Sequence, residues 1–315
     1  MTVDLRKKLI YSAKQRVKEV FTGRDFHINK ASRLIEDFDD MFNLLSEHAR
    51  EWHSIYFPEL NTVIEEHEPF LRIISQVGEK KNYSKENLLK AYANEKKAVE
   101  ALKALRESMG SDLKPEDLIQ VKALAENALS IKRQRNALEA YLEQAMNEYC
   151  PNLKAVAGTL IGAKLLTQGH GLKRMALMPS STIQLLGAEK ALFKHLKTGS
   201  KPPKYGVLFQ HPLVRQGKPW NKGKIARALA AKISIAAKQD FFNEKKELIA
   251  EGLLAELERR AKEIDEQHPN PPSRKPEPSG AEQRPEQNEK RFERKPWGDS
   301  QRQRPFRQFR KFGKR

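Results

Sequence analysis

The stretch Gly187-Ala-Glu-Lys-Ala-Leu-Phe-Lys-His-Leu-Lys-Thr-Gly-Ser-Lys201 predicts a short helix that follows one glycine and ends at another. Three lysines recur at spacings of four and three and so lie on one helical face: Lys190, Lys194 and Lys197. Leu192 and Leu196 share another face, so we expect the helix to bury its leucines and to present its ammonium groups to an anion. The turn at 198–201 adds backbone N–H groups that can bind a phosphate oxygen.

The segment around this helix is strongly basic. Residues 151–239 contain 16 Lys or Arg and a single acidic residue, Glu189, which gives a net charge of +15, against +18 for the whole chain of 315 residues. A lysine face by itself is most simply a solvated surface. A charge of one sign spread over one domain is instead typical of polyanion binding, so this segment predicts a nucleic-acid interface.

Further motifs lie on both sides of the lysine helix. Lys201-Pro-Pro-Lys-Tyr-Gly and Phe209-Gln-His-Pro follow it, and Glu51-Trp-His-Ser-Ile-Tyr-Phe-Pro-Glu-Leu60 lies far upstream. Together with Gly187-Ala-Glu-Lys-Ala-Leu-Phe, these motifs resemble those of the Nop domain family. That family comprises core proteins of C/D-box guide-RNA particles and a related spliceosomal processing factor. The resemblance extends over residues 29–265.

The resemblance implies roles for individual residues. RNA contacts would come from the helix, its turn and the loop that follows: Gly187, Ala188, Lys190, Lys194, Lys197, Thr198, Gly199, Lys201, Lys204 and Gln210. A kink-turn-binding protein of ribosomal type would be contacted by Phe209, Gln210, His211 and Pro212. The RNA would be recognised by its shape and backbone, and binding would weaken steeply with salt.

The function that the resemblance implies is that of a non-catalytic scaffold. With the kink-turn protein it would hold a C/D-box guide RNA and recruit fibrillarin for ribose 2′-O-methylation of rRNA or tRNA. Members of the family begin with an α/β domain that binds fibrillarin, whereas this sequence starts on predicted helices. Either another polypeptide supplies that domain or the chain is a shortened paralogue, so direct fibrillarin binding stays open. The expected location is the cytoplasm of an archaeon or the nucleolus of a eukaryote. A spliceosomal-type pre-mRNA processing factor is the alternative, and an enzyme acting on RNA is a remote one.

Residues 85–149 predict an antiparallel coiled-coil hairpin. Apolar residues alternate at spacings of four and three along 88–109 and again along 124–149, while Gly110 and Pro115 separate the two arms. Charged residues fall in the same seam and predict register-setting contacts or a further helix packed alongside: Glu95, Arg106 and Arg135. Such a hairpin either stays within one chain or self-associates. The resemblance favours a homodimer formed through Leu102, Leu138 and Leu142.

The expected fold is therefore all-α with four parts. Residues 1–84 would form helices that pack on the coiled-coil base, including an amphipathic helix over 3–21. Residues 85–150 would form the coiled coil, and 151–268 a helical Nop domain. Residues 269–315 contain 14 Lys or Arg against 6 acidic residues, a net charge of +8, and predict a disordered tail. Its arginines and interleaved aromatics suit RNA contact, with a solubilising role as the alternative.

Composition and motif content argue against several classes of protein. No uncharged stretch is long enough to span a bilayer, and the first residues lack the apolar core of a secretory signal. Cys150 is the only cysteine, so an internal disulfide and a cysteine-based metal site are excluded. Residues 217–224 fail as a phosphate loop because Ile225 stands where Ser or Thr would bind magnesium. No cofactor and no metal are expected, and a ribonuclease pair of His195 and His211 has no support in the sequence.

Overall fold

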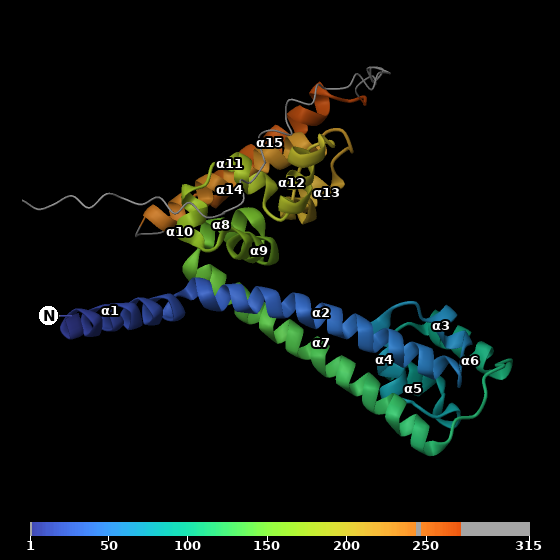
Figure 1. Ribbon diagram of the computed structural model, residues 1–315. Helices are drawn as coiled ribbons and strands as arrows, with labels where there is room; N and C mark the ends of the chain where they lie inside the picture. The colour runs from blue at the N-terminus through green and yellow to red at the C-terminus, as the bar shows by residue number, and fades with distance from the viewer. Residues whose placement is uncertain (1, 244–246, 272–315) are drawn as a thin grey trace, which may run out of the picture. The chain divides into compact units, whose positions relative to one another are not determined.

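The computed structural model of the chain describes residues 2–243 and 247–271, and all regular secondary structure within them is helical (Figure 1). The prediction of an all-α fold is confirmed. The predicted tail falls almost entirely outside the described residues. Five helices are longer than twelve residues: α1 Thr2–Thr22, α2 Arg24–Ser54, α7 Pro115–Tyr149, α14 Lys222–Phe242 and α15 Ala250–Gln267.

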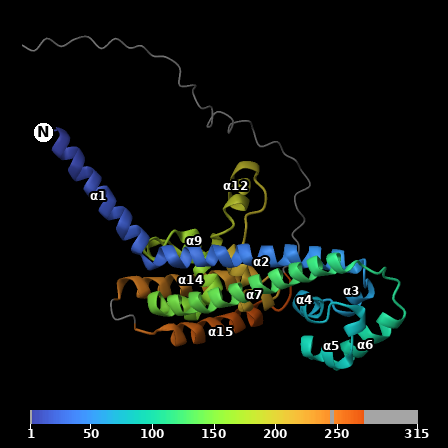
Figure 2. The ribbon, with the colours of Figure 1, turned by 90° about the horizontal axis from the view of Figure 1, so that it is seen from below.

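Helices α2 and α7 form a long antiparallel hairpin, and they lie side by side in both ribbon views (Figures 1 and 2). Buried alanines on both helices, such as Ala49 and Ala125, let the two backbones approach closely. Arg135 of α7 donates to Asp39 of α2 across 2.9 Å and pairs with Glu139 on its own helix. Since Arg135 is a charged residue within the seam, this contact sets the register of α2 against α7.

The arms of this hairpin differ from the predicted ones. Residues 85–109 are not the partner of α7, because they form two short helices, α5 (Lys85–Ala91) and α6 (Glu95–Arg106), that pack on each other. The apolar spacing is real, but Asn94 interrupts it: its side chain accepts a hydrogen bond from the Lys97 N–H at 3.3 Å and starts a new helix. The further helix expected beside the charged seam is α2, which supplies the long arm.

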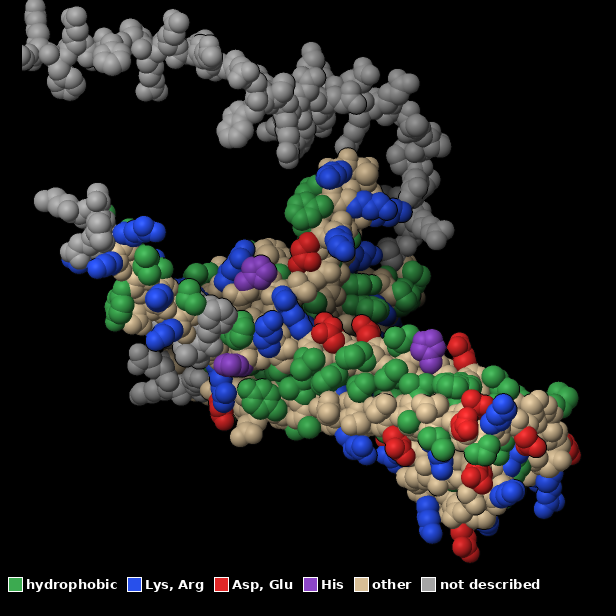
Figure 3. Space-filling model, turned by 60° about the horizontal axis from the view of Figure 1, so that its bottom comes forward, with side chains coloured by type: hydrophobic (Ala, Val, Ile, Leu, Met, Phe, Trp, Pro, Cys, Tyr) green, Lys and Arg blue, Asp and Glu red, His purple; other side chains and the backbone are tan. Residues whose placement is uncertain are grey.

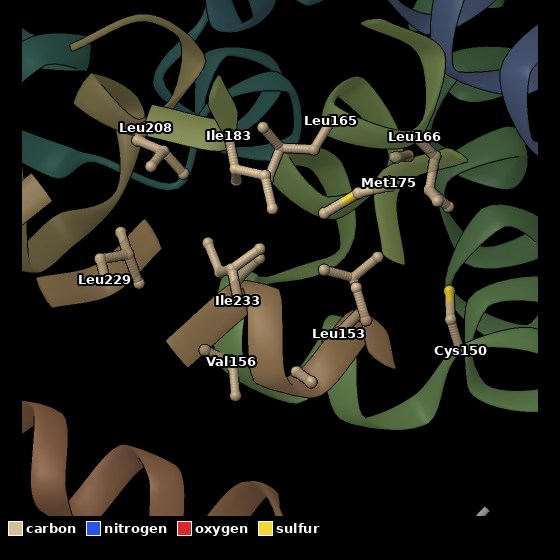
Figure 4. Close-up of a cluster of buried hydrophobic side chains, with 14 of the residues drawn as sticks. Cys150, Leu153, Val156, Leu165, Leu166, Met175, Ile183, Leu208, Leu229 and Ile233 are labelled. Atoms are coloured by element: carbon tan, nitrogen blue, oxygen red, sulfur yellow. The ribbon is translucent and has the colours of Figure 1, made fainter. Parts of the chain in front are cut away.

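The buried side chains form two clusters. One joins α5 and α6 to α3 (Glu59–Val63), α4 (His67–Gln76) and the hairpin, with Phe57 and Phe70 among its largest members. The other gathers around α14, where Leu153, Met175 and Ile233 point toward one another (Figure 4). α14 is apolar on most of its sides and is therefore enclosed by other helices: α8 Pro151–Ala157, α10 Leu172–Leu177, α11 Ser180–Leu185, α13 Pro212–Gln216 and α15.

A buried carboxylate connects the end of α14 to the start of α8. Asp240 is only 4% exposed and accepts hydrogen bonds from the backbone N–H groups of Asn152 and Leu153, at 3.1 and 2.8 Å. The Asn152 side chain donates to Asp240 at 2.8 Å and to the Glu247 carbonyl at 2.9 Å. The first N–H groups of a helix have no partner within it, so Asp240 satisfies the open end of α8 and fixes it on α14.

Helices α9 (Thr159–Gly169) and α1 differ in how they contact the hairpin. α9 packs against both α2 and α7. The helix predicted over 3–21 is α1, and its apolar residues Leu5 and Leu9 are exposed rather than packed on the hairpin.

Candidate nucleic-acid interface

Helix α12 (Glu189–Thr198) carries the predicted lysine face. Lys190, Lys194 and Lys197 are all exposed, and no carboxylate among the described residues pairs with them. The prediction that the helix buries its leucines is wrong, because no residue of α12 is buried and Leu196 is 69% exposed. α12 stands out from the neighbouring helices in Figure 2, and Lys, Arg and apolar side chains share this projection in Figure 3.

Backbone hydrogen bonds close the base of this projection, which spans residues 187–206. Gly206 donates to the Gln184 carbonyl at 3.0 Å and Val207 donates to the Leu186 carbonyl at 2.8 Å. The chain crosses itself so closely there that a Cβ on Gly206 would lie 2.0 Å from the Leu186 oxygen. The Gln184 side chain, which is nearly buried, adds a third bond to the Lys204 carbonyl. The position of α12 is therefore set at its base.

The turn after α12 has the geometry that the glycine predicts. Gly199 is left-handed, with φ of 67°, and its N–H donates to the His195 carbonyl at 2.8 Å. Thr198 donates its hydroxyl to the Lys194 carbonyl at 2.8 Å, and the His195 ring contacts the Ser200 carbonyl. At the other end, Gly187 is also left-handed, with φ of 84°. Its N–H donates to the Glu189 carboxylate at 2.8 Å, so the one acidic residue of the basic segment binds the backbone just before α12 and does not pair with the lysines of the helix.

The predicted partner-binding loop is divided between surface and core. Phe209, Gln210 and Pro212 are exposed at the end of a 3₁₀ turn, η2 (Val207–Gln210). The Phe209 ring stacks on Tyr205 at 5.0 Å, and the Lys222 ammonium lies 5.0 Å from its centre. His211 is also predicted to face a partner, but its side chain is buried within the chain. Burial lowers the pKa of His211, and a hydrogen bond with the Val156 backbone partly opposes that shift.

The structure adds cations that the lysine spacing alone does not indicate. The start of α14 lies beside the loop after α12: a Cβ on Gly223 would be 3.4 Å from the Lys204 stem. Lys224 and Arg227 of α14 therefore share a surface with Lys201 and Lys204. The basic run Trp220-Asn-Lys-Gly-Lys224 was the available signal in the sequence.

The residues predicted for self-association have mixed positions. Leu142 is fully buried within the chain, so it offers no exposed surface for the predicted contact with a second copy. Leu102 and Leu138 are partly buried against the two core clusters. Figure 3 shows an exposed apolar band along the hairpin. Several large apolar residues of α2 and α7 are exposed: Leu34, Met41, Leu44, Trp52, Ile119 and Tyr141.

Two observations on residues 2–243 and 247–271 concern metal ligands and membrane-spanning helices. No group of three or more His, Cys, Asp or Glu side chains is placed to hold a metal ion there. None of the helices described is apolar over a bilayer's width.

The fold and site define a class: all-helical proteins in which a helical domain presents a cationic projection suited to a polyanion. A family model described as "Nop: snoRNA binding domain, fibrillarin" matches residues 34–263. The chain therefore belongs to the Nop family, and the resemblance seen in the sequence is confirmed.

Individual relatives agree with this assignment. An uncharacterized NOP5 family protein of Methanocaldococcus jannaschii is 41% identical over 272 residues, which cover 85% of this chain and 65% of that protein. Nucleolar protein 58 of Candida albicans is 38% identical, over 75% of this chain and 48% of its own length. Nucleolar protein 56 of Bos taurus is 36% identical, over 70% of this chain and 37% of its own. The chain thus spans less than two thirds of the curated relatives it matches.

A crystal structure of a fibrillarin/Nop5p complex is also similar to this chain. It has 23% sequence identity and a TM-score of 0.46, and the match covers 82% of this chain and 77% of that one.

Proposed function

We propose that this protein is a non-catalytic RNA-binding subunit of a C/D-box guide-RNA particle. The observation that carries the proposal is the exposed, unpaired lysine face of α12, which lies inside the segment matched by the snoRNA-binding family model. Ammonium groups without carboxylate partners are free to bind phosphates, and each phosphate they neutralise releases condensed counterions from the RNA, which favours binding. Phe193 on the same helix is 60% exposed and offers an aromatic surface to a base.

The finer roles form part of the same proposal. The loop with Phe209, Gln210 and Pro212 contacts RNA and a kink-turn-binding protein together, and its exposed stacked rings support that role. His211 supports the loop from inside. Recruitment of fibrillarin for ribose 2′-O-methylation is supported by the description of the family model.

Self-association is assigned to the exposed apolar band of the α2–α7 hairpin. Monomeric proteins seldom leave contiguous apolar surface of this kind in water, and a second copy would cover it with a matching band. The double change Met41→Asp and Leu44→Asp removes two exposed members without touching a buried one. We expect it to give a monomer in sedimentation equilibrium; an unchanged oligomer would place the contact elsewhere.

The experiment that tests the proposal is a gel shift with a C/D-box guide RNA and a kink-turn-binding protein. Lys190→Glu with Lys194→Glu should weaken the complex by at least tenfold, because two phosphate contacts become repulsive. The matched control is Lys96→Glu with Lys103→Glu on α6, an equal change of charge at two exposed lysines. Equal binding by the two double variants would refute the proposal. RNA sequencing after a pull-down from native extract separates guide RNA from the spliceosomal alternative.

A further inference from the structure

A cavity of about 670 Å³ lies where α11, the loop at 201–204 and the start of α14 meet. Its size is that of a site for a small organic ligand. Its lining includes the apolar residues Leu185, Pro203 and Trp220 and four cations: Lys201, Lys204, Lys224 and Arg227. Only Lys201 and Lys204 were assigned to RNA by the family resemblance, so the indole and the α14 cations have no role so far.

The indole of Trp220 is held in place from behind. Its Nε1–H donates to the His268 carbonyl at 2.9 Å, and the side chain of the next residue, Asn221, donates to the same oxygen at 3.2 Å. Asn221 is buried and also bonds the Asp265 carboxylate at 2.8 Å. The polar edge of the indole is thus satisfied at the end of α15. One ring of fixed orientation therefore lines the cavity, and a planar ligand could stack on it at little entropic cost.

The described side chains that line the cavity carry positive charge only. No acidic residue lines it. Lys224 and Arg227 are three residues apart on the exposed face of α14, and neither pairs with a carboxylate in the described part of the chain. The Lys204 backbone is fixed by Gln184, so its ammonium projects from an anchored loop. Lys204 of the loop and Lys224 and Arg227 of α14 thus line one cavity, which is an environment for an anion.

We propose that this cavity binds one unstacked nucleotide of single-stranded RNA, with its base on the Trp220 indole and its phosphates on Lys224 and Arg227. The inference rests on the proposed function, because it assigns a nucleotide subsite to the same RNA-binding subunit. A nucleotide joins a flat apolar face to an anionic group, as the walls and rim require. Residues 272–315 carry a net charge of +8, so by charge they do not match a cavity lined by cations.

The test uses the full chain and a fluorescein-labelled octauridylate, a single strand without a kink-turn, measured by fluorescence anisotropy. Trp220→Ala should weaken binding about tenfold, while Trp220→Phe keeps a stacking ring and most of the affinity. The matched control is Phe242→Ala, which removes an exposed aromatic ring from the far end of α14. Arg227→Gln should lower the slope of log affinity against log salt by about 0.7, since one phosphate contact is lost.

Several outcomes would overturn the assignment. If Trp220→Phe lost as much affinity as Trp220→Ala, the loss would come from breaking the indole N–H bond to His268, and the stacking role would be refuted. Unchanged binding by both Trp220→Ala and Arg227→Gln would also refute it, and so would equal affinity for an aspartate-rich peptide. If the unmodified protein failed to bind guide RNA but bound octauridylate in a manner that depends on Trp220, only the proposed function would be rejected. If it bound guide RNA but its binding of octauridylate did not depend on Trp220, the nucleotide site would be rejected and the proposed function would stand.

Discussion

Replacing Asp240 with alanine tests whether one buried carboxylate holds α8 on α14. The change removes the acceptor of three hydrogen bonds, two from the backbone of α8 and one from the Asn152 side chain. Asn152 keeps its second bond to the Glu247 carbonyl, so the main loss is two buried N–H groups without partners. Each such group costs about 1–3 kcal/mol, and the cavity left by the side chain adds to this. We expect the free energy of unfolding to fall by about 4 kcal/mol.

The assay is urea denaturation followed by far-UV circular dichroism, with amide exchange of α8 as a local readout. Asp240→Asn should lose about half as much, because one side-chain oxygen remains while its amide nitrogen faces a donor. The control is Asp40→Ala on the exposed face of α2, expected to change the free energy of unfolding by less than about 0.5 kcal/mol. A loss below about 1 kcal/mol for Asp240→Ala, or α8 exchange equal to that of the control, would refute the reasoning.

Two further predictions concern the hairpin end and the projection. His53 is fully buried beside Tyr56 and Phe70, and burial together with the nearby Lys80 charge lowers its pKa to about 4. As the pH falls, the unfolded chain takes up the His53 proton before the folded chain does, so the free energy of unfolding is highest above pH ~6.5 and falls by about 3 kcal/mol by pH ~4. His53→Phe should remove this part of the pH dependence in urea titrations. An identical pH profile for the variant would contradict the assignment. Gly206→Ala should expose residues 187–206 to limited proteolysis, because its Cβ would clash with the Leu186 carbonyl oxygen. In Gly199→Ala the Cβ would contact no other atom, so only the left-handed φ is strained, at a cost of about 1–2 kcal/mol. Equal cleavage of the two variants would show that the close approach of Gly206 to Leu186 does not hold the base of the projection.

The error in the hairpin shows what periodicity can and cannot determine. The predicted apolar positions along 88–109 are only partly right. Leu88 is buried, but Val99 and Met109 are exposed, and Ala98 and Ala101 are buried in their place. Spacing does not say which helix such a face meets, since α2 carries the same pattern over a greater length. The decisive residues are Asn94, which breaks the first arm, and Arg135, which needs a carboxylate that α2 supplies through Asp39.

The burial of His211 was equally hidden from the sequence. It stands between the exposed residues Gln210 and Pro212, in a segment that reads as a polar loop. Its direction depends on the backbone of Val156, more than fifty residues earlier, which only the packing of α8 brings near. Tertiary contacts of this kind decide which member of a recognised motif reaches the surface.

The lysine face of α12 could be predicted because it depends on local spacing alone. Burial of its leucines would need a surface packed against them, and the described residues do not supply one. A helix of ten residues is too short to be stable in water by itself, so the glycine turns and the hydrogen bonds at the base must hold it. Leaving Phe193 and Leu196 exposed gains nothing for folding. Their exposure beside three unpaired lysines is accounted for by a partner with both anionic and apolar surface, and an RNA with accessible bases has both.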